Sequence, residues 1–246
     1  MEGRQAVLAL LQAGRRRVQR VLLAEQQEPA PILDEIERWC RQRRVPVELV
    51  SAGRLAQLAS TQQPQGVLAY AEAVPEVDLD ELVADERALL VVLDGVTDPQ
   101  NVGSLARSAA CLGASGLVLP RHRSGELTPS VMKVAAGGLE HLAVCRVPGV
   151  PAALARLEQL GCRTLGLSER ADRSLYDLED EVLQGPVALV LGAEGSGLRR
   201  LSAARCHELV RIPLAGRLPA LNVAVAGAVA LAEVARRRGT GRRPVA

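Results

Sequence analysis

The chain has 246 residues, 48% of them hydrophobic, and a formal net charge of only +2. This length suffices for one large domain or two smaller ones, and the core must be aliphatic, because the sequence contains no Phe, one Trp and two Tyr. So few aromatic residues argue against a protein that holds nucleic-acid bases by aromatic stacking, such as an RRM or an OB-fold reader.

The basic side chains are almost all arginine, with Lys133 the only lysine among 30 basic residues. Genomic composition can produce this bias, and arginines on one face of a helix are commonly no more than solvated. The alternative is a polyanionic partner, because the planar guanidinium group binds phosphate oxygens in pairs. Both interpretations stay open at this point.

The five cysteines and three histidines are scattered along the chain and form no CxxC pair. We therefore expect neither a disulfide framework nor a metal site, and a reducing compartment fits best. No apolar run reaches ~18 residues, and the N-terminal arginines follow the short apolar stretch, which is the reverse of a signal peptide. We expect a cytoplasmic protein with no membrane association.

The first 74 residues predict a small α/β domain. Apolar residues recur at helical spacing in some stretches and form short β-like runs in others. Arginines on the outer faces of this domain form either a solvated surface or a footprint for a polyanion. The expected elements are a helix over 3–13, a strand around 21–23, a helix that begins at Pro31, a strand over 45–50, a short helix over 51–59 and a strand over 66–73.

Residues 75–87 are acidic and begin with a proline, so we expect an interdomain linker with a helical turn. The second domain, over 88–246, alternates strands with helices, which implies a mainly parallel sheet covered on both faces. The terminal RRRGTGRRPVA is expected to be a frayed tail. The expected elements are strand 88–94, helix 101–112, strand 116–119, helix 129–136, strand 142–147, helix 151–160, strand 163–168, an irregular acidic stretch 174–181, strand 187–191, helix 198–204, strand 208–212 and helix 221–237.

Three loops follow strands of this second domain: 94–101, 192–197 and 213–222. Ligands of open α/β sheets bind at the carboxyl ends of strands, where such loops lie. The only two asparagines, Asn101 and Asn222, end two of the loops, although each could be no more than a helix N-cap. The glycines of the second loop, GAEGSG, could equally serve plain turn geometry. Because no GxGxxG follows the first strand, a nicotinamide-linked enzyme is not expected.

Three segments carry a resemblance to a known family. NVGSLAR, LVLGAEGSGL and RIPLAGRLPALNVAVAGAVALAE are similar to motifs one, two and three of the SpoU/TrmH family of S-adenosyl-methionine-dependent RNA ribose 2′-O-methyltransferases, within the SPOUT superfamily. The match spans 88–237 in the family's order and spacing. The N-terminal GRQAVLALL, VQRVLLAE and QGVLAY resemble the family's small ribosomal-protein-like substrate-binding domain, an arrangement closest to members that methylate a guanosine of 23S ribosomal RNA.

The resemblance implies an α/β catalytic domain with a deep trefoil knot, in which the C-terminal segment passes through a loop. It also implies S-adenosyl-methionine bound against the knot, and a homodimer whose active sites lie at the interface. By position, the cofactor contacts would be Gly192, Ile212 and Leu221. The reaction-centre residues would be Asn101, Arg107, Glu194 and Asn222.

These residue types suit the implied chemistry. A ribose 2′-hydroxyl is a poor nucleophile, so the reaction needs in-line positioning and stabilisation of a developing alkoxide. Arg107 can bind the adjacent phosphate and stabilise that oxygen, and Asn101 and Glu194 can hold its guanidinium group in place. A role for Arg107 as proton acceptor would require its pKa to fall by several units, so we favour the positioning role.

Motif three departs from the family at two positions. The family usually reads Ser-Leu-Asn-Val-Ser, whereas Ala220 and Ala224 stand here in place of the serines. A lost donor that stabilises a transition state can cost ~100-fold in rate. We expect an active enzyme that acts on 23S ribosomal RNA, and no DNA partner. The alternatives are methylation of tRNA and a catalytically weakened RNA-binding factor in ribosome assembly.

Overall fold

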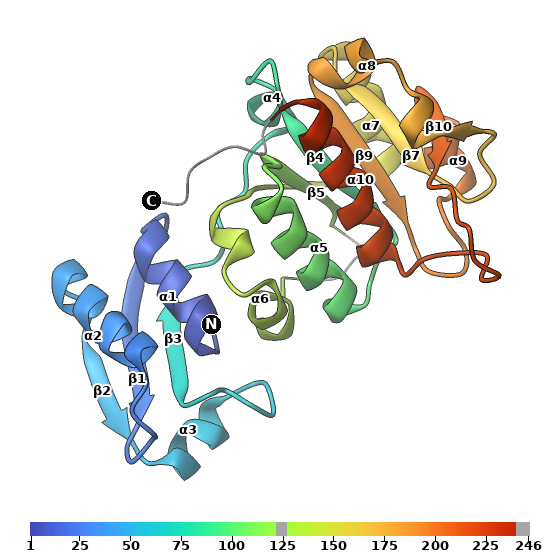
Figure 1. Ribbon diagram of the computed structural model, residues 1–246. Helices are drawn as coiled ribbons and strands as arrows, with labels where there is room; N and C mark the ends of the chain where they lie inside the picture. Colours follow the sequence, from blue (N-terminus) through green and yellow to red (C-terminus); the bar gives the residue numbers. More distant parts are fainter. Residues whose placement is uncertain (122–126, 240–246) are drawn as a thin grey trace.

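The computed structural model describes residues 1–121 and 127–239 (Figure 1). Two sheets form its framework, one in each half of the chain. The smaller sheet has three strands in the order β2-β1-β3, and the larger has seven strands in the order β6-β5-β4-β9-β7-β10-β8. Figure 1 shows the two halves side by side, with α1 and α6 between the sheets.

The first half contains the helices and strands expected from its sequence. Strand β1 is central, pairing in parallel with β2 and antiparallel with β3. Successive residues of a strand point to opposite faces, so Val21 and Leu23 pack on α1 and α2 while Leu22 packs on α3. The elements are α1 (Arg4–Ala13), β1 (Val18–Ala24), α2 (Pro31–Arg43), β2 (Val47–Val50), α3 (Ala52–Leu58) and β3 (Val67–Ala71).

The acidic stretch after β3 contains the expected helical turn, α4 (Leu79–Leu82). Asp78 and Glu81 form a capping box at its start, which satisfies backbone donors of the first turn. Leu82 is buried in the core of the second half, and the Val77 amide donates to the Val144 carbonyl at 2.9 Å. This stretch therefore lies against the larger sheet.

Every strand pair of the larger sheet is parallel, which confirms the expected sheet type. None of the described helices is both long and apolar enough to cross a membrane. The elements are β4 (Leu89–Asp94), α5 (Pro99–Cys111), β5 (Gly116–Pro120), α6 (Pro129–Ala135), β6 (Ala143–Val147), α7 (Val150–Gln159), β7 (Arg163–Leu167), β8 (Arg173–Ser174), α8 (Asp180–Gln184), β9 (Val187–Gly192), α9 (Arg200–Ala203), β10 (Glu208–Arg211) and α10 (Val223–Arg237).

The acidic stretch 174–181, expected to be irregular, instead includes the second residue of a two-residue strand, a short 3₁₀ turn (Leu175–Asp177) and the start of α8. Strand β8 pairs in parallel with β10 at the sheet edge. Arg173 of this strand forms ion pairs with Glu179, at 2.5 Å, and with Glu208, at 2.8 Å. A strand of two residues carries no periodicity, and its pairing depends on these tertiary contacts, so sequence pattern alone does not reveal it.

The large sheet has a core on each face. Along β4, Leu89, Val91 and Leu93 face the core shared with α5 and α10. The intervening Leu90 and Val92 face the core shared with α7. All six residues of β4 are buried, which explains why the sequence reads as an unbroken apolar run rather than an alternating one.

The parallel arrangement brings the carboxyl ends of the strands to one edge of the sheet. Asp94, the last residue of β4, is paired in register with Gly192, the last residue of β9. The loops that follow these strands therefore start side by side. Passage of the C-terminal segment through a loop, which a trefoil knot requires, stays a prediction.

The first residues of the expected C-terminal tail are ordered. Helix α10 continues to Arg237, and Arg238 is buried at its end. The Arg238 guanidinium donates to the carbonyl oxygens of Leu183, Gly185 and Arg87 at 2.5 to 2.6 Å. A frayed tail is thus wrong for residues 236–239, because these hydrogen bonds hold the helix end, and the rest of the tail lies outside the described residues.

A buried ion pair joins the two halves of the molecule. Arg16 donates through Nε and Nη2 to both carboxylate oxygens of Glu140, at 3.1 and 2.5 Å, and the two side chains are only 8% and 2% exposed. The neighbouring Arg15 donates to the carbonyl oxygens of Glu140 and Leu142. The two halves are therefore held in a defined relation by directional contacts.

We expect Arg16→Met to lower the free energy of unfolding by about 3 to 5 kcal/mol, because Glu140 would remain as a buried charge without its partner. Urea denaturation followed by circular dichroism measures this change. Arg38→Met is the matched control, since the Arg38–Glu35 pair is largely exposed and should contribute at most about 1 kcal/mol. Equal losses in the two variants would contradict the importance of the buried pair.

Candidate active site

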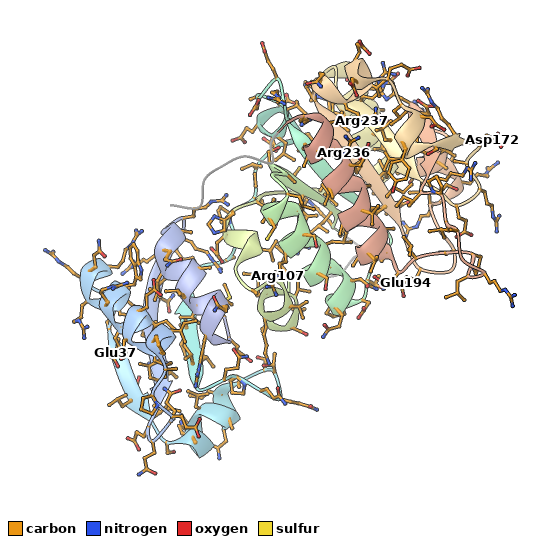
Figure 2. The ribbon with its side chains drawn as sticks, viewed as in Figure 1. Glu37, Arg107, Asp172, Glu194, Arg236 and Arg237 are labelled. Carbon is orange, nitrogen blue, oxygen red and sulfur yellow. The ribbon has the colours of Figure 1, made fainter. Side chains whose placement is uncertain are left out.

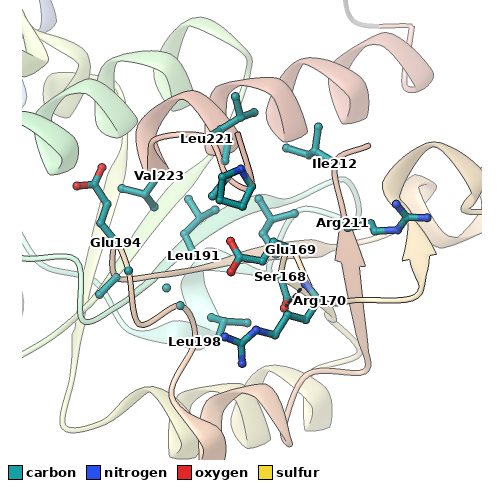
Figure 3. Close-up of a pocket in the computed structure, with 18 of the residues that line it drawn as sticks. Ser168, Glu169, Arg170, Leu191, Glu194, Leu198, Arg211, Ile212, Leu221 and Val223 are labelled. Carbon is teal, nitrogen blue, oxygen red and sulfur yellow. Dashed lines mark hydrogen bonds between the residues drawn. The ribbon is translucent and has the colours of Figure 1, made fainter. Parts of the chain in front are cut away.

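A pocket of about 660 Å³ opens at the carboxyl edge of the larger sheet (Figure 3). Its walls come mainly from three segments: 167–170 at the end of β7, 191–198 at the end of β9, and 209–226 from β10 into α10, with Ala203 of α9 in addition. The volume lies in the range of small-molecule sites. Two of the three loops expected at strand ends, 192–197 and 213–222, thus meet in one pocket.

The glycine-rich loop turns sharply back on itself. The Gly197 amide donates to the Ala193 carbonyl at 2.8 Å, and Gly195 and Gly197 have positive φ angles of 76° and 65°. A Cβ atom at Gly192 would lie 2.1 Å from the Gly197 carbonyl carbon and 2.2 Å from the Leu198 nitrogen. Position 192 therefore requires glycine, because the backbone of Gly197 and Leu198 lies where a side chain would begin. The loop folded in this way forms one wall of the pocket.

The three residues expected to contact a cofactor all line this pocket. Gly192 ends β9, Ile212 follows β10 directly, and Leu221 lies just before α10. Figure 3 shows Leu221 and Ile212 on one side of the pocket and Leu198 on the opposite side. The site is thus a mostly apolar slot edged by main-chain groups, which suits a flat, partly apolar ligand.

Asn222 connects two of the other expected residues at the rim of the pocket. Its Nδ2 donates to Asn101 Oδ1 at 2.9 Å and also to Glu194 Oε1. Its Oδ1 accepts from the amides of Ala224, at 2.9 Å, and Val225, at 3.3 Å. Asn101, Glu194 and Asn222 therefore form one hydrogen-bonded group, as expected for residues that share a site.

The simpler interpretation of the asparagines as N-caps holds for one of them only. Asn222 is the N-cap of α10, in addition to its contacts with Asn101 and Glu194. Asn101 lies inside α5, whose N-cap is Asp98, and Asn101 donates its backbone amide to the Asp98 carboxylate at 3.2 Å. An N-cap role for Asn101 is wrong, because the helix begins two residues earlier, at Pro99.

Arg107 lies apart from this group in the same chain. It is six residues beyond Asn101 on α5, which places it about 9 Å along the axis and about 120° around it. Its exposed side chain faces a second cleft, towards the first half of the molecule, and Figure 2 shows it well separated from Glu194. Contrary to expectation, neither Asn101 nor Glu194 holds the Arg107 guanidinium. Within the described residues, the side chains of both are hydrogen-bonded to Asn222 instead.

Asp94 is a buried residue whose role the sequence pattern did not reveal. Its side chain is fully buried, Oδ2 accepts from the Arg199 amide at 2.9 Å, and Oδ1 lies 3.8 Å from the Arg199 guanidinium. Oδ1 has no hydrogen-bond partner among the described residues. Arg199 follows the glycine-rich loop, so this carboxylate anchors the loop's far end. The sequence feature that could have indicated this role is the position of Asp94 at the end of the apolar run that forms β4.

The pocket wall contains other polar groups that the sequence did not single out. Glu169 and Arg170 follow β7 and line the pocket. The sequence feature that could have indicated them is, as for Asp94, their position at the carboxyl end of a predicted strand. Nearby, burial raises the pKa of Cys206 to about 12, with a further contribution from Asp94, and the thiol stays protonated at neutral pH. Within residues 1–121 and 127–239, no group of three or more potential ligand side chains is arranged to hold a metal ion.

The comparisons with known proteins agree with this geometry. The sequence model of the SpoU rRNA Methylase family matches residues 88–232. The model described as RNA 2′-O ribose methyltransferase substrate binding matches residues 1–77. Together these two matches account for most of the chain.

Curated relatives and solved structures point in the same direction. A 23S rRNA (guanosine-2′-O-)-methyltransferase of Ralstonia nicotianae is 42% identical over 75% of this chain and 74% of its own length. One of Pseudomonas putida is 36% identical over 96% of this chain and 95% of its own length. The SpoU methyltransferase AviRb from Streptomyces viridochromogenes, solved in complex with the cofactor AdoMet, superposes with a TM-score of 0.80 at 27% identity, covering 98% of this chain and 90% of that one.

Proposed function

Because this chain belongs to the SpoU rRNA methylase family, we propose that it transfers a methyl group from S-adenosyl-methionine to the ribose 2′-hydroxyl of a guanosine in 23S ribosomal RNA. The observation that carries this proposal is the single pocket in which Gly192, Ile212 and Leu221 meet, with the Asn222 group at its rim. The names of the relatives support the choice of RNA and nucleotide.

The pocket residues fit the cofactor. Gly192 lets the loop fold tightly, because the backbone of Gly197 and Leu198 lies where its Cβ would be, and residues 192–197 of this loop line the pocket. Leu191, Ile212 and Leu221 provide apolar walls that exclude water. When bound, S-adenosyl-methionine supplies a methyl group on a sulfonium with a good leaving group. The task left to the protein is to position the ribose and stabilise its oxygen as charge develops.

Four polar residues then share two tasks. Asn222 holds Glu194 and Asn101 at the rim, which keeps this edge of the site in one conformation. Arg107 binds the phosphate beside the target ribose and stabilises the developing alkoxide. The task of Arg107 requires that the nucleotide lies between the pocket and a guanidinium group.

The enzyme acts as a homodimer in this proposal, since Arg107 of one chain faces away from that chain's own pocket. Apolar side chains of the pocket wall and of the first turn of α10 are partly exposed, and such patches mark protein interfaces. A second copy placed on them can bring its Arg107 to the pocket. The exposed apolar residues are Leu214, Leu218, Leu221 and Val225.

The domain assignment completes the proposal. Residues 1–74 form the RNA substrate-binding domain, 75–87 the linker, and 88–246 the methyltransferase domain, whose C-terminal segment forms the trefoil knot. Matches to separate family models on either side of the linker support this division. We place the enzyme in the cytoplasm, because ribosomal RNA is its proposed substrate.

The test is transfer of tritiated methyl groups from S-adenosyl-methionine to protein-free 23S ribosomal RNA and to bulk tRNA, followed by mapping of 2′-O-methyl marks. One new mark at a guanosine of 23S ribosomal RNA is expected. A 2′-O-methyl mark on tRNA alone would show that tRNA, and not 23S ribosomal RNA, is the substrate. Cofactor binding without transfer to either RNA would favour the assembly factor, which Ala220 in the pocket wall also favours.

Asn222→Asp should lower the rate of methyl transfer by at least about tenfold while changing the free energy of unfolding by less than about 1 kcal/mol. Aspartate still caps α10, because Asn and Asp are equivalent N-caps. It loses the Nδ2 donor, however, and places a second carboxylate beside Glu194, which repels it. Steady-state kinetics and urea denaturation separate the two effects. An unchanged rate would remove Asn222 from the reaction centre.

A further inference from the structure

A second cleft, of about 700 Å³, lies between the two halves of the molecule. One wall comes from the start of α1 and from the loop 60–65 of the first half. The other wall comes from α5 and α6 of the second half. The lining residues that the inference uses are Gln62, Gln63, Gln100, Arg107 and Lys133.

The charge of this cleft favours an anion. Its only charged lining residues are Arg107 and Lys133, and no carboxylate is among the lining residues that the structure describes. Within the described part of the chain, Arg107 makes no side-chain hydrogen bond or ion pair. The Lys133 ammonium donates to the Gln63 carbonyl and to Thr61 Oγ1, which leaves one of its three donors. Two cationic groups are therefore available to a phosphate.

The loop 60–65 is held firmly in place. Beneath it, the buried Glu2 carboxylate accepts from the amides of Ser60, at 2.5 Å, and Thr61, at 3.0 Å. At its end, Arg4 donates to the side-chain and main-chain oxygens of Gln65, both at 3.0 Å. Lys133 ties the loop to the second half, as described above. The loop is thus ordered before any ligand binds, which lowers the entropic cost of binding.

Unpaired amide groups line the same cleft. The side chains of Gln62 and Gln63 are exposed, and neither makes a side-chain hydrogen bond within residues 1–121 and 127–239. Gln100 lies seven residues before Arg107 on α5, so both project from one face of the helix. A glutamine amide offers an acceptor and two donors, which matches the mixed donors and acceptors on the edge of a nucleobase.

We propose that this cleft binds one unpaired ribonucleotide of the substrate RNA, next to the nucleotide that is methylated. Gln62 and Gln63 contact the edge of its base, and Arg107 and Lys133 bind its phosphate. The cleft has the volume of a small-ligand site, and it lacks the large apolar side chains that anchor a peptide. The inference rests on the proposed function, and assigns recognition of a neighbouring base to residues of the first half.

The test uses the full chain with the double substitution Gln62→Ala/Gln63→Ala, and Gln42→Ala as the matched control, since Gln42 is an exposed glutamine of α2 outside the cleft. With 23S ribosomal RNA as substrate, kcat/KM should fall about ten- to a hundredfold in the double variant. The Kd of S-adenosyl-methionine and the Tm should stay unchanged. Changing the base beside the methylated guanosine should reduce transfer by the parent and have little effect on the double variant.

The outcomes distinguish this inference from the proposed function. If the parent methylates 23S ribosomal RNA and the double variant does so with the same kcat/KM, the cleft inference is overturned and the function stands. If the parent methylates no RNA, the function falls, and fluorescence anisotropy with a labelled single-stranded oligoribonucleotide still tests the cleft. Weaker binding of the oligoribonucleotide by the double variant than by the parent supports the inference. Equal binding by the two proteins overturns it, and so does displacement of the oligoribonucleotide by duplex RNA as effectively as by unlabelled single-stranded RNA.

Discussion

Arg107→Ala should lower kcat for methyl transfer by about 10²- to 10³-fold, because the developing charge on the 2′-oxygen would lose its guanidinium partner. Cofactor affinity should stay unchanged, since Arg107 does not line the cofactor pocket. Single-turnover transfer to ribosomal RNA and calorimetry with S-adenosyl-methionine measure the two quantities. Arg107→Lys should recover only part of the rate, because an ammonium keeps the charge and loses the planar fork.

The control for the lost charge is Arg163→Ala. Arg163 is an exposed arginine at the start of β7 and belongs to neither cleft. Its loss should change kcat by less than about twofold, apart from the weak, salt-dependent effect that any removed cation has on RNA affinity. Retention of the full rate in Arg107→Ala would show that the guanidinium takes no part in the reaction.

Gly192→Ala should weaken binding of S-adenosyl-methionine by about ten- to a hundredfold and lower methyl transfer with it. The added Cβ would lie 2.1 Å from one backbone atom and 2.2 Å from another. The backbone must shift to admit it, at a typical cost of about 1 to 3 kcal/mol, and this shift moves the loop that borders the cofactor pocket. Calorimetry measures the affinity, and thermal unfolding shows whether the chain still folds.

Gly149→Ala is the matched control, because its Cβ would meet no atom within 4 Å and its backbone is extended. This variant should bind the cofactor as the parent does. If Gly192→Ala also bound it normally, the glycine-rich loop would not border the cofactor, and the assignment of the pocket would have to change.

The two variants together test the shared active site of the proposed homodimer. Arg107→Ala lacks the guanidinium, and Gly192→Ala binds little cofactor at a concentration near the Kd of the parent, so under that condition a dimer of one chain of each retains one working site. Random exchange makes about half of the dimers mixed, which predicts about a quarter of the parent rate. No recovery on mixing would place Arg107 and the cofactor of one reaction in the same chain.

Sequence periodicity was sufficient for most of the fold. The apolar runs of β4 and β9, with helical patterns between the strands, predicted the parallel sheet and nearly all of its elements. These signals are local, because a strand buried on both faces or a helix with one apolar face leaves its pattern in consecutive residues. The two-residue β8 and the buried Arg238 left no such pattern, since distant partners hold them in place.

By itself, the sequence determined the elements, the two-part organisation, the family, and which residue types could carry methyl transfer. Only the tertiary structure decided which of them meet. Asn222 contacts Asn101 across 121 positions and Glu194 across 28, because parallel pairing gathers strand ends at one edge of the sheet. Arg107 turns to the other cleft, because six residues on a helix rotate it away from Asn101. That cleft exists because the halves are joined by contacts such as Arg16–Glu140, and packing between distant segments leaves no periodic trace in sequence.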